Sequence, residues 1–583
     1  MKRIFLTLAL ALLASCGTSD PNGGRTTAQG WTDSERNQFY TGDQGSRIMK
    51  TSWMVALKRP DGQPFLGDQL NRYGYLSNEL DQTSILPIGF TTNGVGPDQA
   101  IGMTCSACHT REIQVNNTRH RIDGGPAIVD FESFLIDLNA SVGTVVAQPA
   151  AFDAFALSVL GASGTQDQKA KLLADVTVWH TRFNTLITRS LPTPLWGPGR
   201  LDAVSMIFNR LTGLDIGPKG PNDMIPENIR AADAPVRYPF LWNASRQDKT
   251  QWPGFADNGD GILALARNVG EVYGVFAEFH PFRDKKKLLN VNYIANNSAN
   301  LDGLMKLERL IEKLDPPKFP WPVDPTLAAQ GKAIYGTGPN AEGSCWGCHG
   351  IMPGANRFLE AKPTWKTPII DVGSDTRQYD VLATTVKTGT LSGAGVPFLI
   401  PPLKPEDTAF NTLRMAVVGG ILQKLFDFRT GGRDAAAAPP VATLEQTTIQ
   451  APAAATTQQR VLASSQTAQT LLGAYQTPTV SAAYESRVME GIWAAAPYLH
   501  NGSVPTLADL LKPATQRPAS FKIGPEYDPV NVGLAVNQTR FNQVLRTTDC
   551  ADRNSGNSRC GHEYGIELTA QQKRALLEYL KTL

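Results

Sequence analysis

Two short stretches of the sequence carry the same arrangement of chemically active residues. Residues 105–109 read Cys-Ser-Ala-Cys-His, and residues 345–349 read Cys-Trp-Gly-Cys-His. In such a run two thiols can bind the vinyl groups on one porphyrin edge, and the adjacent imidazole can bind the iron. A lone C-x-x-C also occurs in redox dithiols and zinc sites, but the following His and the repeated run favour haem. We therefore expect two covalently bound c-type haems, held by Cys105, Cys108, His109, Cys345, Cys348 and His349.

The overall composition is that of an ordinary globular protein. The 583 residues are 42% hydrophobic and 19% charged, which allows two or three domains with proper cores. The net charge is only +2, so no strong field would attract nucleic acid. The 52 glycines and 40 prolines indicate many loops, as expected where backbone wraps a cofactor.

The N-terminus indicates export. Lys2 and Arg3 precede an apolar run over residues 4–13, which is too short to span a membrane. The ending Leu-Ala-Ser-Cys at residues 13–16 resembles a bacterial lipobox, which implies a lipid on Cys16 and an outer-membrane anchor facing the periplasm. An ordinary cleaved signal is the alternative. Residues 17–30, rich in small and polar side chains, are expected to form a flexible tether.

Prolines mark a division of the remaining chain. Residues 316–326 contain a proline cluster that cannot continue a helix, and we interpret this segment as a linker. It would separate an N-terminal haem domain (31–315) from a C-terminal cytochrome c-like haem domain (327–583) with a low-complexity insertion at 434–466. Apolar periodicity predicts helices within 151–190, 299–314, 327–335 and 568–583. The predicted fold is therefore mostly α-helical, with two cytochrome c-like haem domains, long loops and little β structure.

The remaining cysteines and histidines bear on how the haem sites are completed. In an oxidising compartment Cys550 and Cys560 would most simply pair as a disulfide, two free thiols being the alternative. Each haem iron has a sixth position that decides between electron transfer and chemistry. The histidines outside the motifs are His120, His180, His280, His500 and His562.

Residues 491–506, which read Gly-Ile-Trp-Ala-Ala-Ala-Pro-Tyr-Leu-His-Asn-Gly-Ser-Val-Pro-Thr, resemble a segment of bacterial dihaem cytochrome c peroxidases and their MauG-like relatives. In those proteins a Met or Tyr about fourteen residues after the His binds the second haem. Residues 510–514 here are Leu-Leu-Lys-Pro-Ala, which include neither a Met nor a Tyr. We expect His562 to serve instead, with His500 as the second choice, or as a structural residue beside the haem.

A narrower resemblance points to the rubber oxygenase (RoxA-type) branch and its fatty-acid dioxygenases. It rests on the first haem motif, on residues 196–200 (Trp-Gly-Pro-Gly-Arg) and on the stretch around His500. The resemblance implies O2 binding at an open N-terminal haem in an apolar pocket. Trp196 and Phe208 would then be distal aromatics with Arg200 near the haem edge, the alternative being core packing. His120 is a weaker candidate for capping this haem.

The sequence thus favours an O2-dependent dioxygenase of an unsaturated lipid, such as a fatty acid, or of a polyisoprenoid. An apolar pocket without an acid–base His suits addition to a C=C bond better than cleavage of H2O2. The first alternative is a periplasmic peroxidase that reduces H2O2 with electrons from a small donor cytochrome. The second is a non-enzymatic electron-transfer cytochrome.

Overall fold

The computed structural model combines helices with many short strands. It describes residues 24–259, 261–287, 289–338, 344–355, 363–396, 400–426, 470–471 and 474–583. Helices predominate, with 38% helix against 14% strand, so the fold is mixed. The expectation of little β structure was wrong in degree, because strands of two to six residues leave too short an alternating pattern to read in the sequence.

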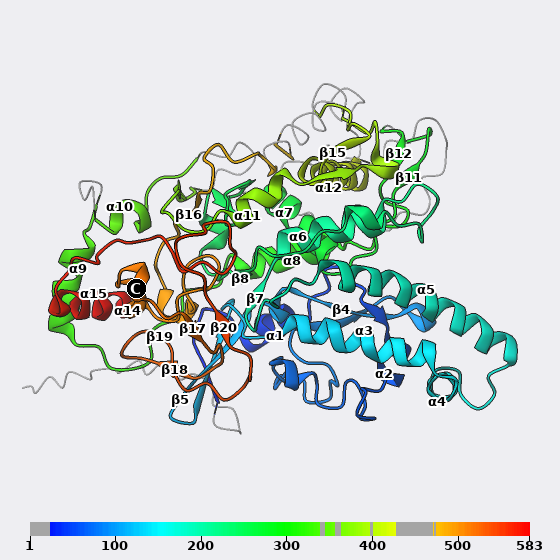
Figure 1. The fold of residues 1–583 in the computed structure, drawn as a ribbon, viewed down its shortest axis with the longest axis horizontal. Helices are drawn as coiled ribbons and strands as arrows, with labels where there is room; N and C mark the ends of the chain where they lie inside the picture. Colours follow the sequence, from blue (N-terminus) through cyan, green and yellow to red (C-terminus); the bar gives the residue numbers. More distant parts are fainter. Residues whose placement is uncertain are drawn as a thin grey trace, which may run out of the picture.

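Three helices form a layer at one end of the molecule (Figure 1). They are α3 (Phe131–Ala147), α4 (Pro149–Leu160) and α5 (Gln166–Ser190). The backbone nitrogen of Gln168 donates to the side chain of Thr165, and the backbone nitrogen of Thr165 donates to the side chain of Gln168. This capping box fixes where α5 begins. Helical structure predicted within 151–190 is confirmed, although it is divided at Gly161, whose φ of +73° favours glycine. Among the described helices none alone is long and apolar enough to cross a membrane; α3 and α4 pass that test only together, bent by 103°.

Two small sheets flank the first C-x-x-C-H run. One has the order β2 (Met49–Lys50), β4 (Ala100–Met103), β3 (Phe90–Asn93). The other joins β5 (Thr110–Val115) and β6 (Thr118–Asp123) in an antiparallel hairpin, with β1 (Gly24–Thr26) parallel to β6. The run thus lies on the short connection between β4 and β5.

The centre of the molecule is a buried helical core. It contains α6 (Ala203–Phe208), α7 (Gly261–Gly274), α8 (Leu301–Ile311) and α12 (Ala409–Phe426), which lie close together in Figure 1. Most side chains of α7 are buried, so this helix is covered on nearly all sides. The helix predicted within 299–314 is confirmed as α8.

The second C-x-x-C-H run lies near a closely packed helix pair. Helix α9 (Pro325–Tyr335) packs against α15 (Ala570–Thr582), and α10 (Trp346–His349) and α14 (Leu507–Leu510) lie nearby in Figure 1. Gly331 permits the close approach of α9 and α15, since a Cβ there would lie 2.0 Å from the carbonyl oxygen of Ala575. The helices predicted within 327–335 and 568–583 are both confirmed.

The remaining elements are short. Among the described residues, the other α-helices are α1 (Asp33–Thr41), α2 (Thr51–Ala56) and α11 (Arg377–Asp380). The other strands form antiparallel pairs: β7 (Arg200–Leu201) with β8 (Val236–Arg237), β9 (Lys249–Thr250) with β10 (Ala256–Asp257), β11 (Phe282–Arg283) with β12 (Val291–Asn292), β13 (Ile369–Ile370) with β16 (Tyr484–Glu485), β14 (Thr385–Lys387) with β15 (Glu406–Thr408), β17 (Ser520–Phe521) with β20 (Leu545–Arg546), and β18 (Tyr527–Asp528) with β19 (Gly533–Leu534).

The proline-rich segment between α8 and α9 contains no helix or strand and packs against the C-terminal half of the chain. The indole nitrogen of Trp493 donates to the carbonyl of Pro317 at 2.8 Å, and the ring of Trp321 stacks on Tyr527. Two hydrophobic cores draw residues from both sides of this segment. One joins Phe208 and its neighbours to α12, and the other joins residues of α1 to Trp493 and α15.

Part of the predicted tether is ordered. Residues 24–26 form β1, and the buried side chain of Gln29 donates to the carbonyls of Asp123 and Asp315. A polar side chain can be fixed in this way when backbone carbonyls satisfy it, which composition alone does not reveal. The predicted signal peptide (1–16) and low-complexity insertion (434–466) lie outside the described residues.

Candidate haem sites

The first motif, residues 105–109, is wound into a single tight turn. The carbonyl of Cys105 accepts hydrogen bonds from the backbone nitrogens of Cys108 (3.2 Å) and His109 (3.0 Å). The turn packs directly on Gly89, where a Cβ would lie 2.1 Å from the nitrogen of Ala107. Gly89 also has a φ of +87°, so any other residue there would displace the motif.

A backbone carbonyl fixes the imidazole of His109. Its Nδ1 lies 2.9 Å from the carbonyl oxygen of Pro239. Because a carbonyl can only accept, Nδ1 carries the hydrogen and Nε2 keeps its lone pair for a metal. Burial lowers the pKa of His109 to about 4, so the ring stays neutral at pH 7.

The second motif, residues 345–349, repeats this arrangement. The carbonyl of Cys345 accepts from the nitrogens of Cys348 (3.2 Å) and His349 (2.9 Å). The Nδ1 of His349 lies 2.8 Å from the carbonyl oxygen of Arg487, and burial lowers the pKa of this imidazole too. Both motif histidines are therefore neutral and oriented by a distant backbone carbonyl, as an iron-binding imidazole requires.

A second imidazole faces His349. The ring centres of His349 and His562 are 6.1 Å apart, with their planes inclined by 45°. Two imidazoles that bind one metal from opposite sides, each at about 2 Å, place their ring centres about 6 Å apart. The Nδ1 of His562 is buried and has no hydrogen-bond partner among the described residues, and burial lowers the pKa of this ring to about 3. His349 and His562 are therefore spaced so that they could hold one haem iron between them.

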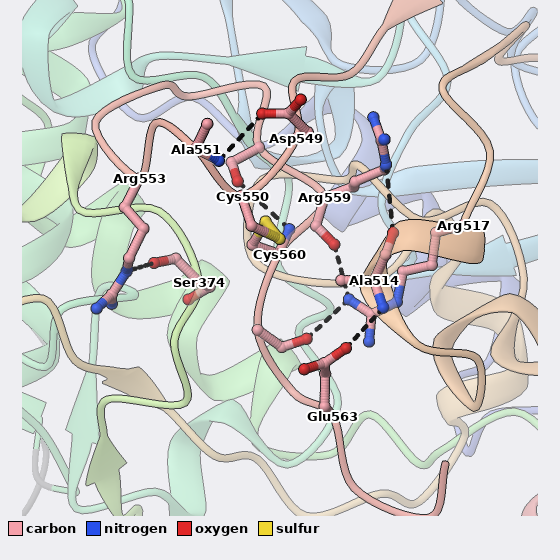
Figure 2. Close-up of a disulfide and its surroundings, with 12 residues drawn as sticks. Ser374, Ala514, Arg517, Asp549, Cys550, Ala551, Arg553, Arg559, Cys560 and Glu563 are labelled. Atoms are coloured by element: carbon pink, nitrogen blue, oxygen red, sulfur yellow. Dashed lines mark hydrogen bonds between the residues drawn. A yellow bond between two sulfur atoms is a disulfide. The ribbon is translucent and has the colours of Figure 1, made fainter.

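The loop that carries His562 is held by a disulfide and an arginine (Figure 2). Cys550 and Cys560 are bonded, which confirms the predicted pairing. The guanidinium of Arg517 donates to the carbonyls of Arg559 and Gly561, both at 2.7 Å, and to that of His562 at 3.3 Å. Arg517 could not be identified from the sequence, because contacts to backbone carbonyls leave no pattern of residue types.

The other candidate histidines have different surroundings. His500 is buried, stacks on Tyr484 at 3.7 Å between ring centres, and places Nε2 2.8 Å from Asp375. These contacts fit its alternative interpretation as a structural residue. His120 lies on β6 with its ring edge-on to Trp321, 5.1 Å away. The ring of His120 contacts Trp321, and that of His500 contacts Tyr484 and Trp252.

The two predicted distal aromatics, Trp196 and Phe208, lie in different hydrophobic cores. Trp196 is buried in the same hydrophobic core as Cys108, and its indole nitrogen donates to the carbonyl of Ala232. Phe208 belongs to the central core around α7 instead. The structure thus brings Trp196, but not Phe208, into the core that includes the first motif.

All three guanidinium nitrogens of Arg200 donate hydrogen bonds. Its guanidinium is 1% exposed and donates to the carbonyls of Trp196, Asn501 and Gly556 and to the side chain of Asn557. These bonds connect the Trp196 loop to the segment after His500 and to the disulfide loop. This pattern matches the packing alternative raised for this residue.

Two buried arginines, Arg111 and Arg487, lie near the motifs, and no pattern in the sequence indicates them. Arg111 is 0% exposed, and its Nε and Nη2 have no hydrogen-bond partner among the described residues. The same is true of Nε and Nη1 of Arg487. Such donors suit carboxylates, and a porphyrin carries two as propionates. The donor set around the motifs therefore fits haem c.

Comparison with known proteins agrees with this chemistry. Residues 483–522, which include Arg487, His500 and Arg517, match the family model described as RoxA-like, cytochrome c-like. The chain is 30% identical over 619 residues to the uncharacterized protein y4iJ of Sinorhizobium fredii (strain NBRC 101917 / NGR234), covering 95% of this chain and 92% of that protein. It is 24% identical over 362 residues to the uncharacterized protein y4iM of the same strain, covering 59% and 63%. The chain therefore belongs to the family of protein y4iJ, and its RoxA-like domain supports a RoxA-related cytochrome c family.

Proposed function

We propose that the protein is a dihaem c-type cytochrome that oxygenates an unsaturated apolar substrate with O2. In this proposal haem one is attached to Cys105 and Cys108 and bound by His109. Haem two is attached to Cys345 and Cys348 and bound by His349 and His562. The chain would be a relative of the dihaem peroxidase and MauG-like proteins, within the RoxA-type branch.

One observation carries the proposal, namely a difference between the two motif histidines. Both rings are held by a backbone carbonyl, but they differ in the side chain that faces them. His349 is faced by a second imidazole at 6.1 Å. The ring contact described for His109 is with Tyr238, edge-on at 6.2 Å, and no second imidazole is paired with it among the described residues. Haem two would therefore be closed and suited to electron transfer, whereas haem one would have a site for O2.

The surroundings of the first motif favour an apolar substrate. One hydrophobic core includes residues of the motif and apolar side chains beyond it, namely Ala107, Cys108, Trp196, Leu201 and Met206. When bound, haem supplies the redox-active iron at which O2 is activated. Pro239 orients His109 through its carbonyl, and the apolar side chains limit water near the reacting groups.

Oxygen uptake by the purified holoprotein tests the proposal. The protein is given oleate and then polyisoprene, with catalase present and no peroxide. We expect sustained uptake and a hydroperoxide or a cleaved carbonyl product. No uptake, combined with rapid H2O2-dependent oxidation of a reduced donor cytochrome, would identify a peroxidase. Two low-spin haems in both oxidation states, with neither activity, would identify an electron-transfer cytochrome.

We further propose that the chain is exported to the periplasm and anchored to the outer membrane by a lipid on Cys16. The motif at residues 13–16 supports this placement. Replacement of Cys16 by Ser should move the protein from the membrane fraction to the soluble periplasmic fraction. Unchanged fractionation of Cys16→Ser would contradict the anchor.

A further inference from the structure

The chain that leads back to Cys16 meets the described structure beside the turn of the β5–β6 hairpin. Strand β1 runs parallel to β6, with Gly24 opposite Arg119 and Thr26 opposite Arg121. Because β6 begins directly after the turn, the chain enters β1 from the turn side. The turn itself, residues 116–117, is exposed. A lipid on Cys16 would therefore be linked to the molecule at the turn side of this sheet.

A second hairpin turn lies on the same side. The bridge between Gln114 and Glu526 is parallel, so the chain after Glu526 also runs toward the turn side, and it reverses between β18 and β19. The nitrogen of Gln114 donates to the carbonyl of Pro525 at 2.7 Å, and that of Ala535 donates to the carbonyl of Glu526 at 2.9 Å. The two hairpins therefore lie side by side, and Figure 1 shows β5, β18 and β19 together at one end, away from α4.

The β18–β19 hairpin carries two of the most exposed apolar side chains among the described residues. Val530 lies in its turn and is 72% exposed, and Val536 follows β19 and is 91% exposed. The carboxylate of Asp528 accepts from the nitrogens of Val530 and Asn531 within this turn. The exposed residues beside the valines and at the β5–β6 turn are uncharged, namely Asn116, Asn117, Asn531 and Asn537. Repulsion from anionic lipid headgroups would therefore be small at these positions.

Chain length limits which side of the molecule can meet a bilayer that holds Cys16. Cys16 lies eight residues before Gly24, and eight fully extended residues span at most about 29 Å. A compact chain of 583 residues is about 60 Å across. Val536 lies four strand spacings from Gly24, which is about 19 Å. The β18–β19 hairpin is thus within reach of such a bilayer, and the far side of the molecule is not.

We propose that the turns of the β5–β6 and β18–β19 hairpins form a membrane-docking surface, which contacts the bilayer that holds the N-terminal lipid. The inference rests on the lipid anchor proposed for Cys16. Two valines alone would bind a bilayer only weakly, but the lipid keeps this surface at a high local concentration beside it. Val530 and Val536 would then lie in the headgroup region and fix the orientation of the protein on the membrane.

Hydrogen–deuterium exchange followed by mass spectrometry tests this inference on the lipidated holoprotein. The protein is reconstituted in vesicles of phosphatidylethanolamine and phosphatidylglycerol and compared with the soluble Cys16→Ser protein. We expect residues 115–118 and 529–537 to exchange about fivefold more slowly on vesicles, as for amides that are shielded in about four molecules of five. The loop around Val95, which is 85% exposed and follows a strand of another sheet, should exchange equally in both samples.

Substitutions provide the matched comparison. The double variant Val530→Asp/Val536→Asp places two charges in the docking surface and should lose the slower exchange, whereas Val95→Asp should keep it. Equal exchange at both turns on vesicles and in solution would overturn the inference, and so would slower exchange that persists in the double Asp variant. Slower exchange in soluble Cys16→Ser protein as its concentration rises would assign the surface to a second copy of the chain, against the inference. A mass spectrum without an acyl group on Cys16 would instead reject the anchor.

Discussion

The disulfide between Cys550 and Cys560 should stabilise the protein by about 3 kcal/mol. The two cysteines are separated by 10 residues along the chain. Closing a loop of this length in the unfolded chain removes about 9 cal/mol/K of entropy, or about 2.7 kcal/mol at 25 °C. The double variant Cys550→Ser/Cys560→Ser should therefore lose this amount from its free energy of unfolding.

The same variant shows whether the disulfide determines the shape of the folded loop around His562 or only its stability against unfolding. Arg517 still binds the carbonyls of Gly561 and His562, so the folded loop should keep its shape without the covalent bond. If His349 and His562 bind the second haem as proposed, its low-spin spectrum should persist in buffer and disappear at a lower urea concentration than in the wild type. Circular dichroism would follow the backbone in the same titration.

Reduction of the wild-type protein provides the matched control. A thiol reductant should lower the unfolding midpoint of the wild type to that of the double Ser variant, and should not affect the variant itself. A loss of the low-spin spectrum without denaturant would refute the reasoning, because the disulfide would then shape the folded loop. A free energy of unfolding within 1 kcal/mol of wild type would refute it as well.

Two further predictions concern buried carboxylates. Burial raises the pKa of Asp202 from 3.8 to about 6, so the folded state binds the proton more tightly, and stability should fall as pH rises from about 4 to 6. The unfolding midpoint of the wild type should decrease across this pH range, and the decrease should be absent in Asp202→Asn. A decrease that persists in the variant would show that other groups cause it. Asp123 accepts from Arg36 at 2.8 Å and from Tyr40 at 2.6 Å with no exposed surface. Asp123→Ala should lower the free energy of unfolding, measured in urea, by about 3–5 kcal/mol, because the buried charge of Arg36 loses a carboxylate partner. A decrease below 1 kcal/mol would show that Asp33 alone compensates that charge.

The two C-x-x-C-H runs and the disulfide could be predicted because residue type and spacing indicate them directly. A C-x-x-C-H run is recognisable wherever it occurs, and two leftover cysteines have few ways to pair. The choice of His562, with His500 second, depends on the resemblance to the dihaem peroxidases, because residues 510–514 contain neither the Met nor the Tyr that those relatives use. The 6.1 Å between the ring centres of His349 and His562 agrees with this choice, which stays a prediction. The capping box of Thr569 and Gln572 likewise shows directly in the sequence and marks the start of α15.

The supports of these residues could not be predicted, because they act through the backbone or through generic packing. Pro239 and Arg487 hold the motif histidines by their carbonyls, which every residue type possesses. Trp196 and Phe208 are both large aromatic residues, and nothing in their local sequence tells which core each one joins. Long-range packing decides that question, and periodicity records only which face of an element is apolar.

Because two hydrophobic cores extend across the proline-rich segment, neither half of the chain is expected to fold when it is produced alone. Cutting the chain near Pro317 would leave the carbonyl partner of Trp493 on one fragment and the indole on the other. Each fragment would also expose the apolar side chains that the other half covers. Single fragments should therefore aggregate, and soluble material is expected only when the two pieces are synthesised together.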